Sequence, residues 1–140
     1  MATRERRAPR VRAIRGATTV AADEPGLVLD ATRELLAEML ARNAVDGEAL
    51  ISAVFTVTAD LTAAFPARAA RDLGWVDVPL LCAVEIPVPD ALPRCVRVLL
   101  HVHSARPRSA IAHAYLRGAS VLRPDLARVA AACEEALAAS

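Results

Sequence analysis

The sequence contains no lysine and no glutamine, and all 17 of its basic residues are arginines. Because an arginine here can stand where another protein carries a lysine, arginine content alone is weak evidence for a binding site, and position must decide. Aromatic residues make up only 3% of the 140 residues, whereas 55% are hydrophobic. The core must therefore be built mainly from aliphatic side chains, and the length suits one domain rather than two.

Other absences narrow the class of protein. No apolar run reaches the roughly 18 residues of a membrane span, and the N-terminus lacks the apolar segment of a signal peptide. The cysteines, Cys82, Cys95 and Cys133, are odd in number and form no CxxC spacing, which argues against a disulfide framework or a zinc site. The net charge of +1 implies no nucleic-acid partner. We therefore expect a cytoplasmic protein that binds neither membranes nor nucleic acid.

The segment 78–103 organises the rest of the chain. It is predicted to form two apolar strands, 78–86 and 95–103, joined by a proline-rich turn, with Glu85 in the first strand and Arg97 in the second. A charge among valines and leucines costs several kcal/mol unless it is paired or solvated. The pattern indicates either a buried ion pair or a polar site, and we favour the site.

Side-chain alternation places Arg97 on one face of its strand together with His101 and His103. We expect the two strands to be neighbours, and in the right register Glu85 and Arg97 could face one cavity. Cys82 falls on the face opposite Glu85, so it is either a small buried hydrophobic residue or a site residue reached through a bulge or its backbone. The two histidines lack a third ligand, so we predict no metal site.

The remaining elements follow from hydrophobic periodicity and from turn residues. Residues 1–10 are expected to be a solvated arginine-rich arm, with a nucleic-acid or targeting role as the alternative. Residues 11–140 are expected to form one domain. The pattern predicts strands at 11–19 and 51–58, helices at 27–43, 66–74 and 107–117, an extended segment at 120–123, and a C-terminal helix from about 124.

Six motifs in order carry a resemblance to a known family: IRGATT at 14–19, FPARAARDL at 65–73, the segment 82–85, RCVRV at 94–98, AYL at 114–116 and VLRPDL at 121–126. Together they resemble the trimeric α/β class of monofunctional chorismate mutase, the AroH type, over about residues 12–126. The resemblance implies an α/β (α+β) fold with a mixed β-sheet, helices packed on one face, and assembly into a pseudo-α/β-barrel homotrimer. It also implies conversion of chorismate to prephenate in phenylalanine and tyrosine biosynthesis, without a cofactor or metal.

The resemblance further implies site residues at the interface of two subunits. Arg97 would stabilise the ether oxygen, Arg15 and Tyr115 would hold a carboxylate, and Glu85 would accept a hydrogen bond from the ring hydroxyl. The substrate-binding residues implied are Phe65, Ala67, Arg68, Arg71, Leu80, Leu81, Cys82, Leu122 and Arg123. Two positions depart from the family pattern, since Arg68 replaces a usual lysine and Leu81 replaces a threonine.

Two other functions stay open from the residues alone. The chain could be a non-catalytic trimeric module that binds small anionic metabolites, or a structural protein in which Glu85 and Arg97 only pair across a core. A structural pair needs a single arginine, so the additional Arg15, Tyr115 and Arg123 favour a site. Arg97 at its motif position, together with Glu85, favours the enzyme.

Overall fold

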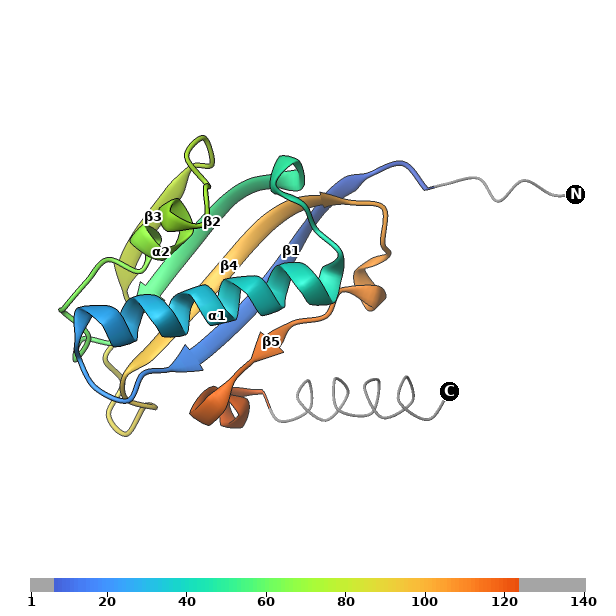
Figure 1. The fold of residues 1–140 in the computed structure, drawn as a ribbon. Helices are drawn as coiled ribbons and strands as arrows, with labels where there is room; N and C mark the ends of the chain where they lie inside the picture. Colours follow the sequence, from blue (N-terminus) through green and yellow to red (C-terminus); the bar gives the residue numbers. More distant parts are fainter. Residues whose placement is uncertain (1–6, 124–140) are drawn as a thin grey trace, which may run out of the picture.

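The computed structural model describes residues 7–123 and has a five-stranded mixed sheet in the order β3-β2-β4-β1-β5 (Figure 1). The strands are β1 (Arg10–Thr19), β2 (Leu50–Val57), β3 (Leu80–Val84), β4 (Cys95–Ser104) and β5 (Ala114–Tyr115). Strand β4 runs antiparallel to both β1 and β2, while β3 is parallel to β2 and β5 is parallel to β1. The predicted mixed α+β fold is confirmed. The predicted C-terminal helix and most of the predicted N-terminal arm lie outside the described residues.

The long helix α1 (Pro25–Asn43) crosses one face of the sheet, which we call the inner face (Figure 1). Its apolar stripe is fully buried and packs against alternate residues of β4 in the main core cluster. Gly16 of β1 lies beneath it, and a Cβ atom there would come within 2.4 Å of Met39 Sδ. The glycine therefore lets the helix approach the sheet closely. No helix in residues 7–123 is long and apolar enough to cross a membrane.

The short helix α2 (Ala67–Asp72) lies beside β3 and begins directly after Pro66. Gly74 follows its end with φ +93°, a left-handed conformation that suits glycine at a helix C-terminus. Trp75 is only 5% exposed and packs in the core. These features match the predicted boundaries of the helix, and they fix the segment that carries Phe65 and Arg71 against the edge of the sheet.

The prediction that the strands carrying Glu85 and Arg97 are joined as neighbours was wrong, because β2 lies between β3 and β4. The connection contains Pro87, Pro89 and Pro93, which have no N–H to donate to a ladder, so the chain passes the end of β2 instead of turning back in a hairpin. Side chains of directly paired residues still point to the same face. Glu85 and Arg97 therefore share a face of the sheet with a β2 residue between them.

The predicted helix at 107–117 was also wrong. One 3₁₀ turn at Arg108–Ala110 is followed by the two-residue strand β5. Asn43 of α1 binds both the N–H and the C=O of Ala112, at 2.8 and 2.7 Å, and holds this segment extended. Residues Arg117–Leu122 form a 3₁₀ helix where an extended segment was predicted for 120–123. In both places tertiary contacts override local propensity.

Candidate active site

Five polar side chains from five parts of the sheet gather on the outer face, opposite α1. We call Arg15, Thr56, Glu85, Arg97 and Tyr115 the sheet cluster. The register places Thr56 and Ala17 on either side of Arg97, and Tyr115 beside Ala17. Arg15 lies two residues from Ala17 and so shares its face. The sheet itself thus brings together four residues that were expected to act on substrate.

Glu85 is held mainly by a threonine rather than by an arginine. Thr56 Oγ1 donates to Glu85 Oε2 at 2.8 Å, whereas Arg97 Nε lies 3.8 Å from the same oxygen. The Thr56 hydroxyl is the largest influence lowering the pKa of Glu85, and the nearby charges of Arg97 and Arg15 lower it further against the effect of burial. Glu85 is therefore ionised at neutral pH, with its carboxylate fixed beside Arg97 but not locked onto it.

Two buried polar atoms of the sheet cluster have no hydrogen-bond partner among the described residues: Arg97 Nε and Tyr115 Oη. Buried polar atoms are nearly always satisfied, so such a pair marks a place where a ligand group can bind. Arg97 lies in β4, which is hydrogen-bonded on both sides by β1 and β2. Its backbone is consequently among the most rigid in the sheet, and a donor held there is preorganised.

Two further predicted site residues lie near the sheet cluster. Leu122 packs against a small apolar cluster that includes Tyr115 and Ala17. Arg123 is close enough to His113 for its charge to influence that histidine, and Arg15 influences the same ring. With Arg123 and Leu122 beside it, the sheet cluster has a third arginine and an apolar border, and it can bind an anionic organic molecule.

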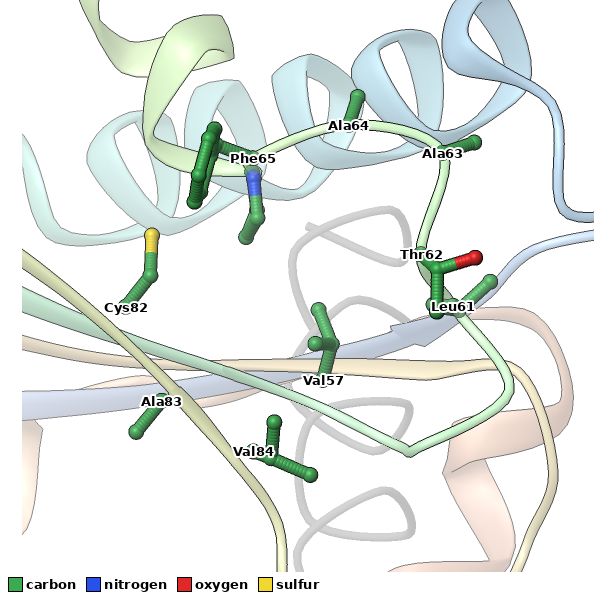
Figure 2. A pocket seen from close by; sticks show the side chains of 10 residues that line it. Val57, Leu61, Thr62, Ala63, Ala64, Phe65, Cys82, Ala83 and Val84 are labelled. Atoms are coloured by element: carbon green, nitrogen blue, oxygen red, sulfur yellow. The ribbon is translucent and has the colours of Figure 1, made fainter.

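The other predicted residues form a separate group along β3 and α2, which we call the edge group: Phe65, Ala67, Arg71, Leu80, Leu81 and Cys82. They line a hollow of about 510 Å³. A neighbouring apolar pocket of about 310 Å³ lies between β3 and the segment 61–66. Figure 2 shows the Cys82 side chain pointing from β3 toward the segment that carries Phe65. Cys82 therefore lines the pocket with its thiol rather than with its backbone.

The sheet cluster and the edge group do not face one cavity within the chain. Cys82 and Leu80 pack against the inner core, whereas Thr56 and Arg97 point to the outer face. Phe65 is 72% exposed despite its size. Arg68 is exposed on α2 and lines neither the hollow nor the apolar pocket. The chain therefore presents two groups of predicted site residues on different surfaces.

No pattern in the sequence singled out two further residues beside the predicted site residues, Thr56 and His113. Thr56 sits in an ordinary strand pattern, and only the strand order reveals that it lies between Glu85 and Arg97. His113 accepts a hydrogen bond from the backbone N–H of Arg15 at 2.9 Å. The two residues are 98 positions apart, so no local sequence pattern predicts this contact. Within residues 7–123, no group of three or more histidine, cysteine, aspartate or glutamate side chains is placed to hold a metal ion.

The chain is similar to known proteins over most of its length. The family model for chorismate mutase type I matches residues 11–126. The chain is 53% identical to chorismate mutase AroH of Thermus thermophilus over 117 residues, which cover 83% of this chain and 96% of that protein. It is 41% identical to chorismate mutase AroH of Bacillus subtilis (strain 168), covering 83% of this chain and 92% of the relative.

A solved structure of a chorismate mutase from Clostridium thermocellum superposes with a TM-score of 0.77 at 47% identity, covering 78% of this chain and 97% of that one. The family match spans the strands that carry the sheet cluster and the helix that carries the edge group. The chain belongs to the type I chorismate mutase family.

Proposed function

We propose that this enzyme converts chorismate to prephenate by holding the substrate in its reactive fold and by placing Arg97 against the ether oxygen. The rearrangement is pericyclic: one C–O bond breaks while one C–C bond forms in a single step. The reaction therefore needs no nucleophile and no proton transfer from the protein. The observation that carries the proposal is the buried Arg97 Nε in the central strand, which is ion-paired with Glu85 at 3.8 Å but donates no hydrogen bond to any described residue.

Negative charge grows on the ether oxygen as the C–O bond lengthens. A fixed cationic donor at that oxygen stabilises the transition state more than the ground state, and such donors typically contribute about 3 kcal/mol. Arg97 suits this role because its strand is paired on both sides and because Glu85 does not take its Nε as a hydrogen-bond donor. The Nε–H donor is therefore available to a guest molecule.

The other members of the sheet cluster orient the substrate. Arg15 and the unpartnered Tyr115 hydroxyl bind one carboxylate, the arginine with its forked guanidinium. Glu85, ionised and fixed by Thr56, accepts a hydrogen bond from the ring hydroxyl. Holding a flexible dianion at three points selects the folded conformer, which removes part of the entropic barrier. Arg123 lies at the same border and attracts the dianion.

The active site is completed by a second subunit. The edge group supplies apolar walls and the positive charge of Arg71, but it lies on a different surface from the sheet cluster of its own chain. A closed ring in which the edge group of one subunit covers the sheet cluster of the next gives every site both halves. Exposed apolar side chains along the edge, Phe65, Leu81, Val84, Ile86 and Val88, support burial in such an interface. We therefore propose a pseudo-α/β-barrel homotrimer with three shared sites.

The experiment follows loss of chorismate absorbance and combines it with subunit mixing. The purified protein should consume chorismate, whereas Arg15→Ala and Arg71→Ala should each be strongly impaired. In an equal mixture of the two variants, a shared site restores activity, because about a quarter of interfaces pair two intact halves. A mixture of Arg15→Ala with Arg97→Ala is the matched control and should restore nothing, because both changes lie in the sheet cluster. Failure of the first mixture, once subunit exchange is verified by mass, would place the whole site in one chain.

A further inference from the structure

Strand β5 carries Tyr115, yet only two residues of it pair with the sheet. So short an edge strand has little stability of its own and needs further contacts to hold its register. Two of these contacts lie just before it: Asn43 of α1 binds both backbone groups of Ala112, and His113 Nδ1 accepts the backbone N–H of Arg15. His113 thus connects the two residues proposed to hold the substrate carboxylate. Its side chain binds the main chain of Arg15, and Tyr115 follows it by two positions in the sequence.

The hydrogen bond requires a neutral imidazole with its proton on Nε2, since Nδ1 must accept. The surroundings favour that form. Burial lowers the pKa of His113, and the charges of Arg15 and Arg123 lower it further. Other charged or basic groups around this residue are Arg12, His101 and Arg108, which line the same pocket, and Arg42 of α1, which donates to the C=O of His113. The acidic group beside them is Glu38 of α1, and it is ion-paired with Arg42 at 2.9 Å.

We propose that His113 is a positioning residue for substrate binding: as a neutral acceptor it fixes Arg15 and Tyr115 relative to each other, and its protonation releases them. This rests on the proposed role of Arg15 and Tyr115 at the carboxylate. It concerns binding rather than the bond-breaking step, because Arg97 lies in β4 and is anchored by β1 and β2 without His113.

Two variants separate this role from simple packing. His113→Asn keeps an oxygen acceptor close to the position of Nδ1 and does not titrate, whereas His113→Leu keeps apolar volume and loses the acceptor. At pH 7.5, His113→Leu should raise the KM for chorismate about tenfold with little change in kcat, as expected for loss of one buried hydrogen bond. His113→Asn should keep a KM within about twofold of the wild type.

The pH dependence gives a readout that packing alone does not move. The wild-type KM should rise as the pH falls below 6.5, the ordinary imidazole value, because the lowered pKa keeps His113 neutral until then. The KM of His113→Asn should lack this rise. This second comparison needs only the wild type and the asparagine variant, so it decides the matter even if His113→Leu does not fold.

The remaining outcomes also test the proposal. A wild-type KM in folded His113→Leu, or the same KM–pH profile in His113→Asn and the wild type, would overturn the proposal. Arg15→Ala is measured alongside. If Arg15→Ala leaves KM unchanged, the role of Arg15 at the carboxylate is wrong. If Arg15→Ala raises KM and His113→Leu does not, only the inference about His113 is wrong.

Discussion

The hydrogen bond between Thr56 and Glu85 is expected to keep Arg97, the proposed catalytic arginine, available to the substrate. Thr56→Val removes the hydroxyl but preserves the β-branched shape, so the strand should fold normally. Without the 2.8 Å bond, the Glu85 carboxylate can move closer to Arg97 Nε than the 3.8 Å of their present ion pair and accept a hydrogen bond from it. The donor would then be occupied when chorismate binds.

The size of the effect follows from the bond that is lost. A hydrogen bond to a charged acceptor contributes about 1.5–3 kcal/mol, and the partial exposure of Glu85 argues for the lower end. We therefore expect kcat/KM for Thr56→Val to fall by about tenfold. Thr56→Ser keeps the hydroxyl and is the matched control, with kcat/KM expected to stay within about threefold of the wild type.

The acid limb of the pH–rate profile provides a second measurement. The folded protein lowers the pKa of Glu85 below 4.5, chiefly through Thr56, so kcat measured at saturating chorismate should be lost only as the pH falls below 4.5. In Thr56→Val the fall should begin at higher pH. If Thr56→Val has the wild-type rate and the wild-type acid limb, Thr56 does not control Glu85 and this reasoning fails.

Two further predictions concern the scaffold. Gly16→Ala should lower the free energy of unfolding by about 1–3 kcal/mol in urea titrations, because its Cβ collides with Met39. Gly26→Ala in α1 meets open space, so it should be neutral or stabilising by up to about 1 kcal/mol, and equal effects of the two changes would contradict the close approach. Asp23→Ala removes the carboxylate that accepts the N–H groups of Thr62 and Ala63 just before Phe65, so it should lower Tm and raise KM. Because the pKa of Asp23 is lowered, mainly by the Thr62 N–H, the Tm difference from the wild type should shrink as the pH falls below 3.8, and a constant difference would argue against the carboxylate.

Elements with a strong repeating pattern could be predicted from the sequence. The apolar positions Val28, Leu35 and Met39 recur at helical spacing, and α1 indeed buries all of them. Alternation along 95–103 correctly separated the buried Val98 and Leu100 from the outward Arg97. In both cases the local hydrophobic pattern and the tertiary environment favour the same structure.

What could not be predicted depends on contacts between distant residues. Strand β5 is two residues long and is held by Asn43 and by the backbone of Arg15, so no window of local sequence encodes it. Side-chain alternation likewise cannot predict the strand order, because it gives the face of the sheet on which Thr56 lies but not which strands lie beside it. The division into a sheet cluster and an edge group also required coordinates, because only the folded chain places Phe65, Ala67 and Arg71 beside β3.

The most direct test of the central claim is kcat for Arg97 variants, measured together with the mass of the assembly. A rigid guanidinium that stabilises the departing oxygen predicts that Arg97→Ala lowers kcat by about 100-fold or more with the assembly intact. Arg97→Lys should also be severely impaired, because an ammonium group keeps the charge but cannot reproduce the position of Nε. A near-normal kcat for Arg97→Lys would contradict the account, and so would an Arg97→Ala variant whose only defect is loss of assembly.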